Sequence, residues 1–380
     1  EIKNYEKISN IKLEKFKIYV NIGVILFKFG KINESIIAFK KSIENKTDFS
    51  LAYNNLAVSY LELGMFQKAS DYFALALKLN KNDLNAQKHL INMFNLVSPK
   101  NNEQNALINL NFKIKNLIND FNITNCHVNK NIKKILNECQ KLILNSGESI
   151  TFNETQIFRK NSKNLNCFRH FKVFNEFNII PKYCFSCYKI QINLFTVIDL
   201  IKLYFIFDNI NLAKNNMRKC MVETRNQIRG NYKGYIYCTG LEEAKSILEL
   251  IKKEIKLENL NKFKIVIKHG CSEFYQSYPE YEKINFDGEQ IMKYNQNWSE
   301  KEKLVDERIP KRNDKDKKIW GTYVKGINLS DVLIINNWMN YADIIGDFSY
   351  KKIFENTIKS NFLNKILENQ VEFRKNNFFN

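Results

Sequence analysis

The sequence predicts an α+β protein in which an all-helical repeat array is followed by a mixed α/β domain. Three observations support this. A 34-residue segment repeats within the first hundred residues, strand–helix–strand patterns begin at residue 232, and the composition changes near residue 150. None of the eight arginines lies before Arg159, and none of the eight cysteines lies before Cys126. We therefore expect one domain over residues 1–148 and a second, rich in Cys, Arg and aromatic residues, over 149–380.

The repeats occupy residues 16–49 and 50–83, and a degenerate third begins at residue 84. Small residues recur where two helices would approach closely, large ones where they would fill the space between, and glycine where the first helix would end. The aligned pairs are Tyr19/Tyr53, Ile22/Leu56, Gly23/Ala57, Leu26/Tyr60, Gly30/Gly64, Ser35/Ala69, Phe39/Phe73 and Ser42/Ala76. This pattern resembles the tetratricopeptide repeat (TPR), which implies a helical solenoid of stacked antiparallel pairs.

The resemblance also implies a peptide-binding groove lined by the first helix of each repeat. Asn21 and Asn55 occupy equivalent inward-facing positions, and His89 follows in register. The two amides look like the asparagine ladder of the repeats attached to O-linked N-acetylglucosamine transferases, which binds the ligand backbone; His89 breaks the ladder. The implied partner is a polypeptide. The alternative is that so short an array only supports its own C-terminal domain.

A cysteine-rich segment follows at residues 167–187. Cys167 and His170 form one closely spaced pair, and Cys184 and Cys187 form another thirteen residues later. Two such pairs with this spacing are typical of a small tetrahedral zinc site, so zinc is the candidate cofactor. The alternatives are inert buried cysteines, a redox pair at Cys184 and Cys187, or an iron–sulfur site that recruits Cys220.

The remaining chain predicts strands at 188–195, 232–238, 262–270 and 331–337, with helices at 196–207 and 241–255. A strand–helix–strand unit of this length implies a parallel pair, with functional groups at the strand ends. In a chain with 51 lysines, a retained arginine suggests a planar donor, so Arg218, Arg225 and Arg229 are candidates to hold a phosphate or carboxylate. His269 and Cys271 could form a nucleophilic pair if they faced each other.

Composition limits the function further. The net charge of +19 is spread evenly, +6 over residues 1–100 and +13 over the rest, so nucleic acid is an unlikely partner. No apolar stretch is long enough to span a bilayer, and we expect a cytoplasmic protein. Glycine-rich phosphate loops, GxSxG and HExxH are missing from the sequence.

Three functional hypotheses follow, and whether the protein is an enzyme stays open. The first is a TPR protein that binds a polypeptide, with a C-terminal domain of undetermined activity. The second is a glycosyltransferase-like group-transfer enzyme whose repeats present a polypeptide acceptor. The third is a zinc-containing adaptor that binds nucleic acid.

Overall fold

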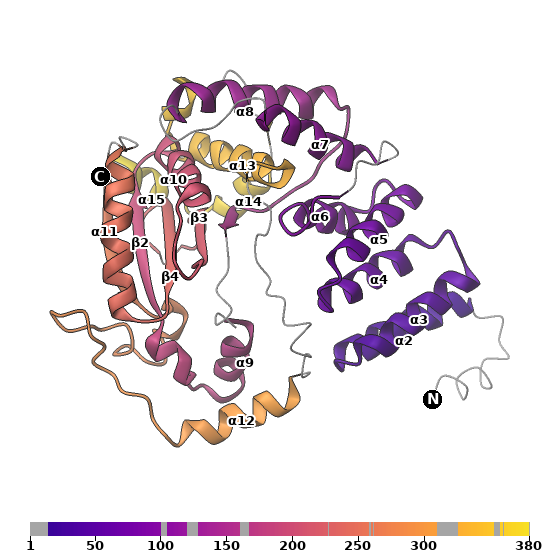
Figure 1. The fold of residues 1–380 in the computed structure, drawn as a ribbon, viewed down its shortest axis with the longest axis horizontal. Helices are drawn as coiled ribbons and strands as arrows, with labels where there is room; N and C mark the ends of the chain where they lie inside the picture. Colours follow the sequence, from indigo (N-terminus) through magenta and orange to yellow (C-terminus); the bar gives the residue numbers. More distant parts are fainter. Residues whose placement is uncertain are drawn as a thin grey trace. The chain divides into compact units, whose positions relative to one another are not determined.

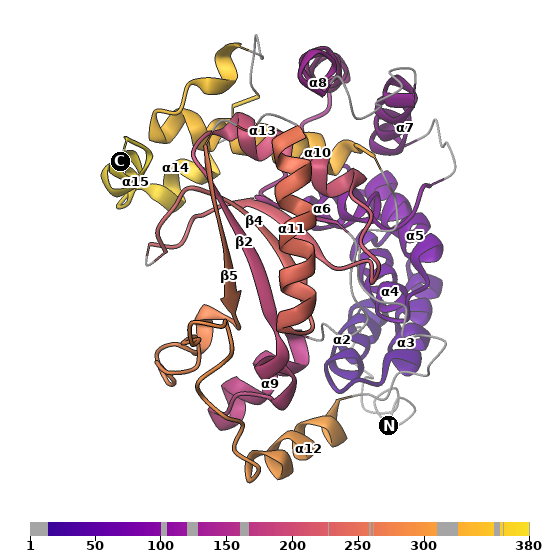
Figure 2. The same ribbon diagram turned by 60° about the vertical axis from the view of Figure 1, so that its left-hand side comes forward.

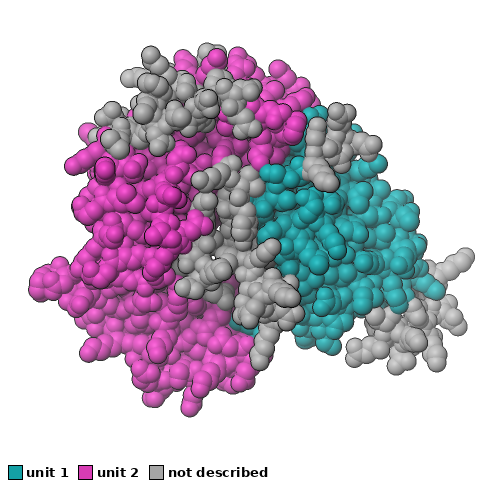
Figure 3. All heavy atoms as spheres, in the orientation of Figure 1, with its two compact units in different colours: residues 1–109, 309–318 teal, residues 110–308, 319–380 magenta. Residues whose placement is uncertain are grey.

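The computed structural model describes residues 14–99, 105–119, 128–159, 167–226, 228–257, 260, 262–309, 326–352, 358–359 and 361–379. The chain forms two compact units that divide near residue 110 (Figure 3). Helix α7 (Ala106–Asn119) spans this division, and α8 (Val128–Asn145) contacts α10 and α13 of the C-terminal unit. The division therefore falls earlier than the composition change near residue 150. No helix among the described residues is long and apolar enough to cross a membrane.

The N-terminal unit is a stack of antiparallel helix pairs (Figure 1). Its helices are α2 (Lys15–Lys28), α3 (Ile32–Asn45), α4 (Ser50–Glu62), α5 (Phe66–Leu79) and α6 (Leu84–Met93). Each helix packs against the next along the chain. The expected helical array is thus confirmed over the two repeats, and α6 lies where the degenerate third repeat is expected to begin.

Two glycines explain the geometry of the first repeat. A Cβ atom on Gly23 would clash with the ring of Phe39, so glycine permits the close approach of α2 to α3. Gly30 adopts a left-handed φ of 75° directly after Phe29, the C-cap residue of α2. There the amide of Lys31 donates to the Leu26 carbonyl (2.9 Å) and the amide of Gly30 donates to the Phe27 carbonyl (2.9 Å). These two bonds form a Schellman cap, which ends the helix.

The C-terminal unit is built around a five-stranded sheet with the order β1-β3-β4-β2-β5. Its strands are β1 (Gln156–Arg159), β2 (Tyr188–Leu194), β3 (Arg218–Val222), β4 (Tyr232–Cys238) and β5 (Phe263–His269). The helices are α9 (Cys167–Phe177), α10 (Val197–Asn209), α11 (Leu241–Leu257), α12 (Trp298–Arg308), α13 (Leu329–Ile345), α14 (Phe362–Leu367) and α15 (Val371–Phe379), with 3₁₀ turns η1 (Lys182–Ser186), η2 (Ser272–Phe274) and η3 (Ser349–Lys352).

Every neighbouring pair in the sheet is antiparallel, so the expected hydrogen-bonded parallel pair is wrong. Strands β4 and β5 do run in the same direction around α11, but β2 lies between them. The order β2-α10-β3-β4-α11-β5 with this pairing is the ferredoxin-like split βαβ arrangement, extended at one edge by β1. The unit is therefore α+β rather than α/β.

Helices α10 and α11 contact the same sheet (Figure 2). A Cβ atom on Gly234 of β4 would clash with Leu203 of α10, so position 234 faces the helices. Because side chains alternate along a strand, Tyr235 and Tyr237 face the opposite side. That second face carries the candidate site described below.

The expected strand at residues 331–337 is wrong, since these residues lie within α13. Asn328 caps this helix: its side chain accepts from the amide of Asp331, and the Asp331 carboxylate accepts from the amide of Asn328. Gly346, with φ 84°, ends it. The helix is buried on nearly all sides, so its apolar run carries no helical period.

A buried ion cluster joins β1, α10 and α13. Arg159 donates from Nε to Asp208 and from Nη2 to Asp331 (both 2.6 Å), and from Nη2 to the Tyr204 hydroxyl (2.7 Å). The Arg159 and Asp331 side chains are 3% and 0% exposed. A charge buried this deeply requires such partners, so the cluster holds the edge strand to two helices.

Candidate functional site

The predicted groove residues lie on three different helices of the N-terminal unit, α2, α4 and α6. Asn21 on α2 is exposed and Asn55 on α4 is half-exposed. Neither side-chain amide has a hydrogen-bond partner within the described residues. His89 on α6 instead stacks on Phe73, with ring centroids 5.0 Å apart. Burial and the charge of Lys88 lower the His89 pKa, so the ring is neutral and acts in packing.

The predicted zinc ligands lie on two elements. Cys167 and His170 are in the first turn of α9, Cys184 is in η1, and Cys187 directly precedes β2. His170 stacks on Tyr183 (5.1 Å), and burial with the neighbouring Arg169 charge lowers its pKa to about 4. Over the described part of the chain, no three His, Cys, Asp or Glu side chains are grouped as metal ligands. Zinc binding therefore stays a prediction.

A further cysteine approaches this segment. Cys271 packs against the apolar cluster that contains Cys184, Phe274 and Tyr281. The amide of Gly270 donates to the Cys187 carbonyl (2.8 Å), which brings the end of β5 beside the start of β2. Burial raises the pKa of Cys187 to about 12 and raises that of Cys184 further, so both are neutral thiols.

The structure does not gather the three predicted arginines. Arg218 on β3 is buried and donates to the Ile210 carbonyl at the end of α10 (2.6 Å), and burial lowers its pKa to about 10. Arg225 donates to both carboxylate oxygens of Glu223, from Nε (2.8 Å) and from Nη2 (2.9 Å). Its Nη1 donates to Glu273 (3.2 Å). Arg229 is exposed. Arg225 is thus already neutralised by carboxylates.

Two lysines and two tyrosines share the sheet face opposite α10 and α11. The register places Lys189 of β2 opposite Tyr237 of β4, and Lys219 of β3 opposite Tyr235 of β4. Directly opposed residues share a face. The ammonium of Lys189 lies 5.1 Å from the Tyr237 ring centre, and that of Lys219 lies 5.3 Å from the Tyr235 ring centre. We call these four residues the sheet-face cluster.

Sequence reasoning missed this cluster because lysine is common throughout the chain. The available signal was the alternation in residues 232–238, which puts Tyr235 and Tyr237 on one face beside a strand that carries Lys189. Burial, together with the charges of Lys189 and Arg225, lowers the pKa of Lys219 to about 8. A lysine perturbed in this way by burial and like charges is a candidate for function.

Cys271 is paired with a lysine rather than with His269. The ammonium of Lys189 lies 3.0 Å from the Cys271 sulfur. The two ring nitrogens of His269 contact the carbonyls of Tyr281 (2.9 Å) and Phe185 (3.2 Å). Since both ring nitrogens are occupied by backbone, His269 holds two loops together and does not act as a base toward Cys271.

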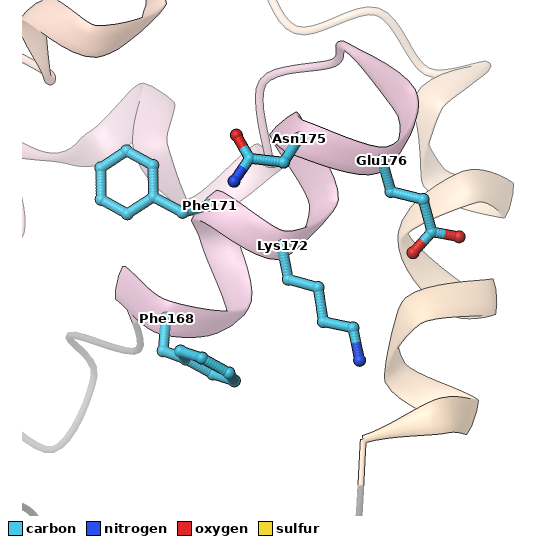
Figure 4. Close-up of a pocket in the computed structure, with 5 residues that line it drawn as sticks. All are labelled: Phe168, Phe171, Lys172, Asn175 and Glu176. Atoms are coloured by element: carbon cyan, nitrogen blue, oxygen red, sulfur yellow. The ribbon is translucent and has the colours of Figure 1, made fainter. Parts of the chain in front are cut away.

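A shallow hollow lies along α9 (Figure 4), lined by Phe168, Phe171, Lys172, Asn175 and Glu176. All five residues belong to one helix, and Glu176 also pairs with Arg308 of α12. The hollow brings together no residues from different elements. It is therefore a weaker candidate than the sheet-face cluster.

Comparison with known families agrees with the repeat geometry. Residues 16–49 and residues 50–83 each match a tetratricopeptide repeat family model. Residues 16–83 are therefore a TPR segment, a class of repeat that binds protein partners. No curated protein matches the chain.

Proposed function

We propose that the TPR segment binds an extended polypeptide through its backbone, with Asn21 and Asn55 as the two principal contacts. The carrying observation is that equivalent positions of consecutive repeats present side-chain amides with no partner among the described residues. An amide offers both a donor and an acceptor, and can therefore pair with a peptide unit whatever side chains flank it. Binding of this kind tolerates ligand sequence.

His89 limits the length of this contact. The ring of His89 stacks on Phe73, and a histidine at this position provides no side-chain amide. Two amides, those of Asn21 and Asn55, can contact only a short peptide segment, so we expect moderate affinity. Each hydrogen bond of this type contributes about 0.5–1.5 kcal/mol.

The test uses an array of random 12-residue peptides to find ligands for the full-length protein, followed by fluorescence anisotropy with the tightest binder. Replacing Asn21 and Asn55 together with alanine should weaken binding about 5- to 150-fold, which corresponds to about 1–3 kcal/mol. Asn45→Ala is the matched control, because Asn45 is exposed on α3 and bonds only to its own helix at the Lys41 carbonyl. N-methylation of the peptide backbone should abolish binding, whereas shuffling its sequence should not. A binder that is insensitive to N-methylation and to the double variant contradicts the proposal.

A further inference from the structure

Strand β5 forms one edge of the five-stranded sheet, and Figure 2 shows it as the outermost labelled strand. It pairs with β2 over all seven of its residues in one continuous register. No other strand of the described chain pairs with it, so its second edge has no partner strand there. The opposite edge strand, β1, has only four residues. A long, regular edge of this kind is a template on which another chain can add a strand.

The register fixes which backbone groups of β5 point away from β2. The amide of Gly270 donates to the carbonyl of Cys187 (2.8 Å), and these two residues are opposite each other in the register. In an antiparallel pair, residues that bond to the neighbouring strand alternate with residues whose amide and carbonyl point the other way. The backbone groups of Phe263, Ile265 and Ile267 therefore point to the open edge. They make no hydrogen bond to any other part of the described chain.

Side chains at this edge are also incompletely covered. Ile265 and Ile267 are opposite Ile192 and Ile190 of β2, and Ile192 is in turn opposite Gly234, which faces the helices. The two β2 side chains are 0% exposed, whereas both isoleucines of β5 are only half-buried. An added strand would cover this remaining apolar surface with its own side chains, which is favourable.

The other face of β5 carries two lysines, Lys264 and Lys268, on either side of Val266. Lys264 is exposed, and no carboxylate of the described residues pairs with it. Lys268 pairs with Glu282 (3.2 Å). Two copies of β5 paired about a twofold axis at Val266, the midpoint of the strand, would place Lys264 directly opposite Lys268. Like charges in that position destabilise a strand pair, so the edge disfavours a second copy and favours an acidic partner.

From this geometry we propose that β5 binds an extended acidic segment of another protein, which adds to the sheet as a further antiparallel strand. Acidic side chains of that segment lie opposite Lys264 and Lys268. Its alternate, apolar side chains lie opposite Ile265 and Ile267. Backbone hydrogen bonds supply affinity, and the two lysines supply selectivity. Antiparallel addition continues the sheet, in which every neighbouring pair is antiparallel.

Amide hydrogen exchange resolved to single residues, on the full-length protein, tests the proposal with a short peptide that alternates valine and glutamate. The amides of Phe263, Ile265 and Ile267 should exchange rapidly in the free protein. With peptide at about ten times its dissociation constant, their exchange should slow about tenfold, because only the free fraction exchanges. The amides of Lys264 and Val266 already face β2 and should change little, which makes them internal controls.

Fluorescence anisotropy with the labelled peptide tests the charges. Lys264→Glu should weaken binding of the valine–glutamate peptide about fivefold and strengthen binding of a valine–lysine peptide, because the cross-strand charge pair changes sign. Lys141→Glu is the matched control, since Lys141 is exposed on α8 and pairs with Glu138 (2.8 Å). It should leave both affinities unchanged.

The same assay tests the backbone contacts. In an antiparallel pair with β5, the valine amides of the peptide face the strand and the glutamate amides face solvent. N-methylation of the valines should therefore abolish binding, whereas N-methylation of the glutamates should not. The double variant Asn21→Ala/Asn55→Ala should bind this peptide as wild type does, because it alters only the TPR groove.

Four results would overturn the proposal. One is no binding of the valine–glutamate peptide to wild-type protein, and another is equal binding of the valine–lysine peptide. A third is bound peptide with unchanged exchange at Phe263, Ile265 and Ile267, or binding that is lost in the Asn21→Ala/Asn55→Ala variant, either of which places the peptide elsewhere. The fourth is slow exchange of those three amides in the free protein together with a dimer in analytical ultracentrifugation, which would assign the edge to a second copy.

Discussion

Replacing Arg159 with methionine should strongly destabilise the C-terminal unit. The substitution keeps the side-chain volume similar and removes the charge that Asp208 and Asp331 share. Asp331 would keep its contacts with the Tyr204 hydroxyl (3.2 Å) and the Asn328 amide (3.1 Å), but its buried charge would lose the guanidinium that contacts it at 2.6 Å. Removing one partner of a buried ion pair costs about 3–5 kcal/mol.

The pH dependence of that loss has a definite sign. Burial raises the pKa of Asp331 even in the wild type, where Arg159 opposes the shift. Without Arg159 the pKa should rise further, so the native state binds a proton that the unfolded chain has already released. Stability then falls as pH rises from the ordinary aspartate pKa through the raised one. The variant should therefore be closer to wild type at pH 5 than at pH 8.

Urea unfolding followed by tryptophan fluorescence measures this directly. Trp298 and Trp338 belong to α12 and α13 of the C-terminal unit, and no tryptophan occurs within residues 1–109. With an m value of about 3 kcal/mol/M, the midpoint should fall by about 1 to 1.7 M. Arg308→Met, which breaks the exposed pair with Glu176, is the control and should cost about 0.5 kcal/mol or less. A midpoint for Arg159→Met within 0.3 M of wild type at pH 8, where 0.3 M corresponds to about 1 kcal/mol, would refute the reasoning.

Three further predictions concern packing, titration and metal. Gly234→Ala should cost about 1–3 kcal/mol because its methyl group would clash with Leu203, whereas at Gly240 the same change meets nothing within 4 Å and should be nearly neutral; equal effects in urea unfolding would contradict this. Lys219→Met should stabilise the ligand-free protein at pH 7, and the gain should shrink between pH 8 and about 10.5, where the native lysine has lost its proton and the unfolded one has not; a gain that grows over that range would argue against it. Elemental mass spectrometry tests the zinc prediction: one zinc per chain that is lost in Cys184→Ser supports it, and metal-free protein with reactive thiols contradicts it.

Local patterns predicted the N-terminal unit well because its contacts are local. Gly30 and Gly64 mark helix ends through hydrogen bonds that span five residues. Because both repeats carry this glycine at the same position, each repeat supports the prediction made from the other. The strands at 188–195, 232–238 and 262–270 were also predicted correctly. The expected parallel pairing of the last two was wrong, because the insertion of β2 between β4 and β5 depends on pairing between residues about 75 positions apart, as in Ile190 and Ile267.

The candidate site shows the same limit. The arginines were chosen because they are rare in the sequence. In the fold, however, Arg218 donates to a carbonyl at the end of α10, and Arg225 pairs with two carboxylates. Lys189 and Lys219 become distinctive only once the register sets them on either side of β4. The alternation in residues 232–238 marks the two tyrosines, but no single-sequence pattern separates these two lysines from the other 49.

The pairing of Arg159 with Asp331 sets the order in which the protein can mature during synthesis. The contacts within the repeats join residues close in sequence, so the repeats can fold as soon as they leave the ribosome. Arg159, in contrast, cannot pair with Asp331 until 172 more residues have been synthesised. At about 5–20 residues per second, that wait is about 9–34 s. During this interval, Arg159 on β1 can pair with Asp208 of α10 but not yet with Asp331. The TPR segment therefore finishes folding well before the domain attached to it is complete.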